Sequence, residues 1–142
     1  MTYKRWKGPL RPVANGASAL RVTLSSDEDA PAHARAAVAR VAPGATDDVL
    51  ERARLLTSEV VTNSVRHAGS TEVRLEVSHA GDWIAVVVCD DGPGFEPSEQ
   101  PARMPHSGGF GLSLLDTLSA AWASGWDHEA WVWFEVSPEL AG

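Results

Sequence analysis

The sequence predicts an α+β fold in which helices pack on one face of a mixed sheet. Apolar residues recur at helical spacing in the first half of the chain, whereas the second half contains the alternating or continuous apolar runs typical of strands. The chain has 142 residues, which suits a single domain, and 44% of them are hydrophobic, enough to bury a core.

A strand and two helices are predicted first. Residues 19–25 (ALRVTLS) alternate apolar and polar side chains, as a half-buried strand does. Three acidic residues and Pro31 then predict the start of a helix, which Pro43 and Gly44 end. A second helix is expected from Thr46, whose hydroxyl can cap it, to Gly69.

The second half of the chain is richer in strands. Residues 72–78 alternate, and residues 83–89 (WIAVVVC) are nearly all apolar, which predicts a central strand buried on both faces. A loop rich in glycine and proline follows. Residues 110–122 are apolar at helical spacing, and a turn around Gly125 is expected to lead to a last strand at 130–136.

Composition excludes several classes of protein. The first 26 residues hold five of the twelve basic residues and none of the nineteen acidic ones, but the acidic remainder would repel a polyanion, so no direct nucleic-acid contact is expected. The single Cys89 excludes an intrachain disulfide. No apolar run approaches the roughly 20 residues that span a bilayer, and no signal peptide is visible, so we expect a cytoplasmic protein without membrane contact.

The same patterns predict the domain boundaries. Residues 1–17 are expected to form a basic N-terminal tail, residues 18–137 the folded domain, and residues 138–142 a C-terminal tail.

The second predicted helix carries the first candidate functional segment. Glu59, Asn63 and His67 are spaced four residues apart and therefore lie along one side of the helix. On a helical projection, Asn63 and His67 adjoin or enter the apolar stripe, and Glu59 lies at its margin. Because a buried polar group needs a partner, these side chains indicate either a site or a hydrogen-bonded core asparagine beside a surface glutamate.

Two glycine-rich segments follow. In VVVCDDGPGF, Asp90 ends the apolar strand and could accept a hydrogen bond from an amine-bearing ring, with Gly92 and Gly94 allowing close backbone approach; a capped turn is an equally good interpretation. In SGGFGLSLLDTL, glycines precede a helix whose free N–H groups could hold phosphate oxygens. Neither segment matches a dinucleotide-binding fingerprint or a Walker A loop.

Taken in order, EVVTNSVRHA, VCDDGPGF and GGFGLSLLDTL resemble the N, G1 and G2 boxes of the GHKL (histidine kinase-like) ATPase superfamily. The chain looks most like the small, single-domain anti-sigma-factor serine/threonine kinases of bacteria. The resemblance covers residues 18–137 and implies the Bergerat-type ATP-binding fold, a two-layer α/β sandwich.

The resemblance also implies roles for individual residues. Asn63 would hold the Mg²⁺ that bridges the ATP phosphates, Glu59 would be the general base towards a protein hydroxyl, and Asp90 would bind the adenine amino group. Backbone groups would shape the rest of the site, at Gly92 and Gly94 around adenine and at Gly109, Gly111 and Leu112 around the phosphates. Residues 95–107 would form a lid in which Arg103 is the only arginine or lysine. For His67 a structural role is expected.

The implied function is that of a Mg·ATP-dependent serine/threonine kinase that phosphorylates an anti-anti-sigma (STAS-type) protein and sequesters a sigma factor. A homodimer is compatible with the resemblance. Two alternatives are a catalytically silent partner-binding module on the same fold and an ATP-binding fragment related to histidine kinases. The sequence identifies neither the sigma factor nor the substrate.

The last predicted strand raises a separate question. Trp131 and Trp133 share one of its faces with Glu135. An exposed face would suit a partner, but we expect the helices to cover it, which would make it part of the core.

Overall fold

The computed structural model describes residues 2–4, 18–67, 71–91, 110–126 and 129–138. Within these ranges the chain order of the elements is β1 (Thr2–Lys4), β2 (Ser18–Ser25), α1 (Ala30–Val41), α2 (Asp47–His67), β3 (Glu72–Ala80), β4 (Trp83–Asp90), α4 (Phe110–Leu118), β5 (Ala121–Trp126) and β6 (Ala130–Val136).

The described strands form one six-stranded sheet in the order β1-β5-β6-β4-β3-β2. Every neighbouring pair is antiparallel, so the predicted mixed sheet was wrong in this detail. The connections explain the difference. Two helices separate β2 from β3, which reverses the direction of the second strand. Among the described residues, α4 lies between β4 and β5 in the chain. Both strands pair antiparallel with β6, so they run parallel to each other with β6 between them.

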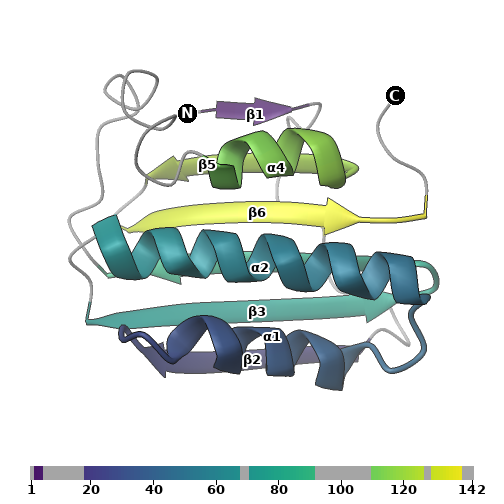
Figure 1. The fold of residues 1–142 in the computed structure, drawn as a ribbon, viewed down its shortest axis with the longest axis horizontal. Helices are drawn as coiled ribbons and strands as arrows, with labels where there is room; N and C mark the ends of the chain where they lie inside the picture. The colour runs from purple at the N-terminus through teal and green to yellow at the C-terminus, as the bar shows by residue number, and fades with distance from the viewer. Residues whose placement is uncertain (1, 5–17, 68–70, 92–109, 127–128, 139–142) are drawn as a thin grey trace.

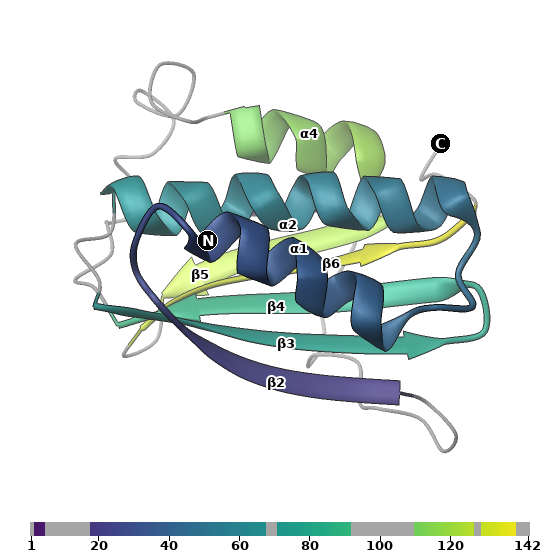
Figure 2. The same cartoon turned by 60° about the horizontal axis from the view of Figure 1, so that its bottom comes forward.

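The three described helices lie on one face of the sheet, as predicted (Figures 1 and 2). Apolar side chains from both layers form the core, including Leu56 and Val60 of α2, Val86 of β4 and Phe134 of β6. Along β3 the buried residues Val73, Leu75 and Val77 alternate with exposed ones, as expected for a strand with one covered face. The predicted α+β two-layer sandwich is therefore confirmed.

Helix α2 begins where the sequence indicates. The backbone N–H of Val49 donates to the hydroxyl of Thr46 at 3.3 Å, and Asp47 and Asp48 lie in the first turn, near the positive end of the helix dipole. No helix in the described part of the chain is long and apolar enough to cross a membrane.

Arg52 fixes α2 to its neighbours. Its side chain is only 9% exposed and donates hydrogen bonds to Asp48 of the same helix, to the carbonyl of Leu118 at the end of α4 (2.9 Å) and to the carbonyl of Ser137 just after β6. One guanidinium therefore holds the start of α2 against the C-terminal ends of two other elements.

The predicted helix at 110–122 was wrong at its C-terminal end. Helix α4 ends at Leu118, and residues 121–126, where we expected a turn, form β5 beside β6. The sequence AWASGW contains Ala, Ser and Gly, which do not favour strands, and Trp122 fits the helical period of the preceding residues. Pairing with β6 overrides these local preferences.

Gly125 has a packing role in β5. It pairs with Trp131 across the sheet, and a Cβ at Gly125 would come within 2.7 Å of the Trp131 ring. The glycine that predicted a turn is therefore a site where an indole lies against the backbone.

The expectation that helices cover Trp131 and Trp133 was also wrong. Val132 and Phe134, which alternate with them, pack in the core beneath the helices, so both tryptophans point to the opposite face of the sheet. Trp133 is nevertheless only 2% exposed, and its cross-strand neighbours are the buried Ala123 of β5 and the partly buried Val87 of β4.

Part of the predicted N-terminal tail is a strand, because Thr2–Lys4 form β1 and pair with β5 at the sheet edge. Residues 5–17 and 139–142 lie outside the described residues.

Candidate functional site

The three candidate segments converge at one end of the molecule. In Figures 1 and 2 the last turns of α2 and the first turn of α4 lie towards the left-hand end, and Figure 2 shows the C-terminal end of β4 at the same end. The residues that flank the first two are in contact, because Thr71, four residues beyond α2, hydrogen-bonds to Asp91, which follows β4.

The position of α4 follows from its contact with Arg52. This contact joins the C-terminal end of α4 to a residue near the start of α2, and the two helices pack side by side in opposite directions. At 1.5 Å per residue, Phe110 lies about 12 Å from Leu118, and Asn63 about 16 Å from Arg52. The first turn of α4 therefore lies alongside the part of α2 that carries Glu59 and Asn63.

Asp90 is the last residue of β4 and is 5% exposed. It follows Ile84, Val86 and Val88 in the alternation of the strand, so its side chain faces the helical layer. A carboxylate so deeply buried requires stabilising interactions, and Asp90 has at least one interaction within the chain. Asp90 thus provides a hydrogen-bond acceptor at the sheet end where α2 finishes.

Glu59 and Asn63 are both half-buried on α2, one turn apart. The buried residues Val60 and Ser64 follow them directly in the sequence, so the two polar side chains lie at the edge of the packed face, as the helical projection predicted. Asn63 has an interaction within the chain. Its amide oxygen is a hard ligand of the kind that Mg²⁺ accepts, and Glu59 is a carboxylate one turn closer to the start of α2.

Gly111 and Leu112 lie in the first turn of α4. The first N–H groups of a helix have no partner within it, so this turn offers donors for anionic oxygens. The other predicted residues of the glycine-rich segments, Gly92, Gly94 and Gly109, lie outside the described residues, as does Arg103. His67 is the last residue of α2.

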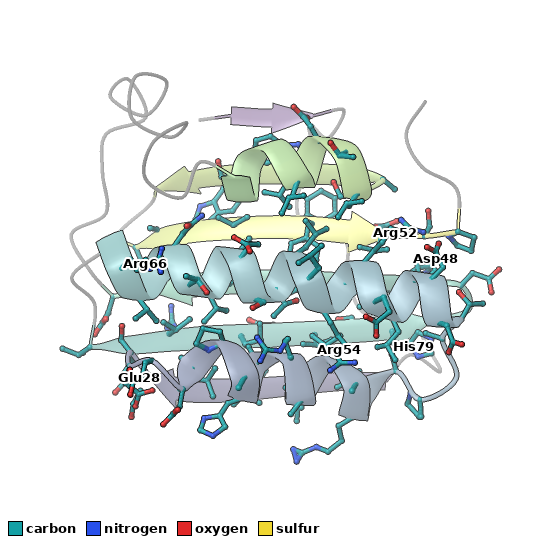
Figure 3. All side chains as sticks on the ribbon, viewed as in Figure 1. Glu28, Asp48, Arg52, Arg54, Arg66 and His79 are labelled. Carbon is teal, nitrogen blue, oxygen red and sulfur yellow. The ribbon has the colours of Figure 1, made fainter. Side chains whose placement is uncertain are left out.

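Sequence reasoning missed two residues at this end. Arg66 follows Asn63 by three residues and is exposed on the last turns of α2 (Figure 3), where it adds a positive charge. The signal was its spacing from Asn63, since residues three apart lie on neighbouring parts of a helix surface. The second residue is Asp91, which the sequence analysis left without a role of its own.

Asp91 accepts three hydrogen bonds, which come from the backbone N–H of Thr71 (2.8 Å), the backbone N–H of Glu72 (3.1 Å) and the hydroxyl of Thr71 (2.6 Å). The Thr71 hydroxyl, followed by the two backbone donors, lowers the pKa of Asp91 to about 2. The described residues contain no cluster of three His, Cys, Asp or Glu that could hold a metal ion.

The sheet, the helices on one face and the arrangement of the three segments define a two-layer α+β domain with the candidate segments at one end. The sequence profile of the histidine kinase-like ATPase domain matches residues 24–131, three quarters of the chain, and the chain belongs to this family. ATP binding is the activity that membership implies. The resemblance noted from the three boxes is thereby confirmed at the level of the superfamily.

Solved structures agree on the fold. The histidine kinase domain of the Erythrobacter litoralis EL346 blue-light activated histidine kinase superimposes with a TM-score of 0.51 at 23% identity, over 75% of this chain and 62% of that one. A second structure of the Erythrobacter litoralis EL346 protein gives a TM-score of 0.50 at 21% identity, over 78% of this chain and 45% of that one. The chain therefore spans less than two thirds of the structures that it matches. No curated protein matched the chain.

Proposed function

We propose that the chain is a Mg·ATP-dependent protein serine/threonine kinase of the anti-sigma-factor type. The observation that carries the proposal is the buried carboxylate of Asp90, which faces the helical layer at the end of the sheet where α2 finishes with Asn63 and Glu59. These residues provide an acceptor for the adenine amino group, an oxygen ligand for Mg²⁺ and a carboxylate base.

The groups at this end of the molecule suit Mg²⁺ and the phosphates of ATP. A Mg²⁺ ion keeps several waters and takes phosphate oxygens, so one protein ligand, the amide oxygen of Asn63, is sufficient. When bound, Mg²⁺ would neutralise charge on the phosphates. The first turn of α4, with Gly111 and Leu112, would donate backbone N–H groups to the same phosphates.

Glu59 is the proposed general base. It is half-buried and lies one turn from Asn63, so a hydroxyl positioned near the terminal phosphate could lose its proton to this carboxylate. Phosphoryl transfer depends mostly on positioning and charge neutralisation, so a single carboxylate base completes the set. A serine or threonine on a partner protein would be the acceptor.

The proposed partners are a STAS-type anti-anti-sigma protein, as the substrate, and a sigma factor, as the sequestered protein. The order of the three boxes and the position of Glu59 four residues before Asn63 support this choice, because they resemble those of the small anti-sigma-factor kinases. A homodimer belongs to the same proposal.

Transfer of labelled phosphate from ATP to a purified STAS-type protein tests the kinase activity. We expect transfer with the wild type and a loss of at least about 100-fold with Glu59→Gln, because a general base contributes roughly 10²–10⁴ in rate. Exposed Glu51→Gln on the same helix is the matched control and should leave the rate unchanged. If ATP binds but no STAS-type or sigma-factor protein accepts phosphate, the chain is a partner-binding module instead.

A further inference from the structure

Asp91 forms a bridge beyond the end of the strand pairing between β3 and β4. The last paired residues are Val73 and Asp90. One step further, the backbone N–H groups of Glu72 and Thr71 are bound by the side chain of Asp91 instead of by a strand backbone. The bridge thus extends the contact between β3 and β4 by one step, at the point where the segment before β3 and the segment after β4 leave the sheet.

Those segments are the ones that carry the proposed site. Thr71 ends the connection from α2, four residues after His67, and Asp91 directly follows Asp90. The carbonyl of Thr71 also accepts the N–H of Ser26, which ties the connection between β2 and α1 to the same point. The Asp91 carboxylate therefore joins the start of β3, the strand that follows α2 in the chain, to the end of the strand that carries Asp90.

We propose that Asp91 is a positioning residue of the nucleotide site, which holds the Asp90 carboxylate in register with α2 by binding Thr71 and Glu72. The inference rests on the proposed function, because it assigns Asp90 to the adenine amino group. Asp91 itself does not contact the nucleotide in this arrangement. Its low pKa keeps it ionised, and the bridge formed, over the whole range in which the protein would work.

Three variants separate the contributions of the hydrogen bonds that Asp91 accepts. Asp91→Ala removes all three hydrogen bonds. Asp91→Asn keeps an oxygen for the two backbone donors, and its NH₂ can donate to the Thr71 hydroxyl, which then accepts. Thr71→Val removes only the hydroxyl contact. Asp48→Ala is the control, because it removes a carboxylate that binds Arg52 at the opposite end of the molecule (Figure 3).

The measurement is calorimetric binding of Mg·ADP and Mg·GDP to the full chain, well below the unfolding temperature of each variant. We expect Asp91→Ala to weaken ADP binding about tenfold and Thr71→Val about threefold, with Asp91→Asn and Asp48→Ala close to wild type. Asp90 distinguishes an amino group from the oxo group of guanine, so Asp91→Ala should also reduce the ratio of ADP to GDP affinity. A merely stabilising role would lower the unfolding temperature and leave this ratio unchanged.

Failure of the inference and failure of the proposed function give different results. If the wild type binds ADP and both Asp91→Ala and Thr71→Val bind it with wild-type affinity, Asp91 does not position the site. The proposed nucleotide site is not contradicted by that result. If Asp91→Ala does not fold, Thr71→Val decides, because it retains both backbone contacts, and unchanged affinity overturns the inference. If the folded wild type binds no nucleotide, the proposed function fails and the inference with it.

Discussion

At the scale of single residues, polar groups at the ends of elements do most to define this domain. Asp90 ends a strand whose other residues on the same face are apolar, and its burial makes it the best-defined part of the candidate site. Asp91, its neighbour, is exposed and fully engaged with Thr71 and Glu72. Two adjacent carboxylates therefore differ in their surroundings, since one is buried against the helical layer and the other is exposed.

The hydrogen bonds of Asp91 should make stability depend on pH in acid. Its pKa in the folded protein, about 2, lies below the ordinary value of 3.8, so the ionised form stabilises the fold above about pH 4, and this contribution is lost as the pH falls towards 2. In Asp91→Asn the titration is absent. In urea unfolding between pH 5 and pH 2, the free energy of unfolding of Asp91→Asn should therefore fall less steeply with pH than that of the wild type. Identical slopes of unfolding free energy against pH would contradict the account.

Gly125 offers a second test at this scale. A methyl group there would meet the ring of Trp131, so Gly125→Ala should lower the free energy of unfolding by about 1–3 kcal/mol. Gly44→Ala is the matched control, because a Cβ at Gly44 meets nothing within 4 Å. Equal stability of the two variants in urea unfolding would show that the Trp131 ring moves aside without cost.

At the scale of elements, the sequence predicted those with a clear period or cap. Helix α2 begins next to the Thr46 cap and ends within two residues of the predicted Gly69, and β3, β4 and β6 match their alternating or apolar runs within two residues. The strand β5 was missed because its residues favour a strand only when β6 lies beside them. The strand β1 was missed for a similar reason, since three residues carry no period.

In the candidate site, too, features set by local sequence patterns were predicted and features set by non-local contacts were not. Asp90, Asn63 and Glu59 could be selected from the sequence because strand end and helix face follow from local patterns. The bridge from Asp91 to Thr71 could not, because it joins residues twenty positions apart through a side chain. The contact of Arg52 with Leu118 and Ser137 is equally non-local.

Arg52 provides the prediction that belongs to the elements. Its removal would leave the carbonyls of Leu118 and Ser137 without this donor and loosen α4 from α2. We expect Arg52→Ala to lower the free energy of unfolding by about 2–4 kcal/mol, as the loss of a buried charged donor does. Arg21→Ala is the control, since the Arg21 side chain is 84% exposed and its pairing with Glu76 contributes little. Chemical unfolding of both variants measures the difference.

At the scale of the whole molecule, the core and the candidate site occupy different regions. The sheet and the packed faces of α1 and α2 form the core, whereas the end at which α2 and β4 finish and α4 begins carries the candidate nucleotide site. Arg52 fixes α2 to α4 at the far end, and Asp91 joins the segments around the site. We therefore expect Arg52 to affect mainly the stability of the domain, and Asp91 to affect the geometry of the proposed site as well.

The central claim is that Asp90 and Asn63, far apart in the sequence, form one Mg·ATP site. Isothermal calorimetry with ATP and Mg²⁺ tests it most directly, on the wild type, Asp90→Asn, Asn63→Ala and the exposed control Arg21→Ala. The account predicts micromolar binding by the wild type and the control, loss of binding in Asp90→Asn, and loss of the Mg²⁺-dependent part in Asn63→Ala. Absence of binding by the folded wild type, or unchanged affinity in Asp90→Asn, would contradict it.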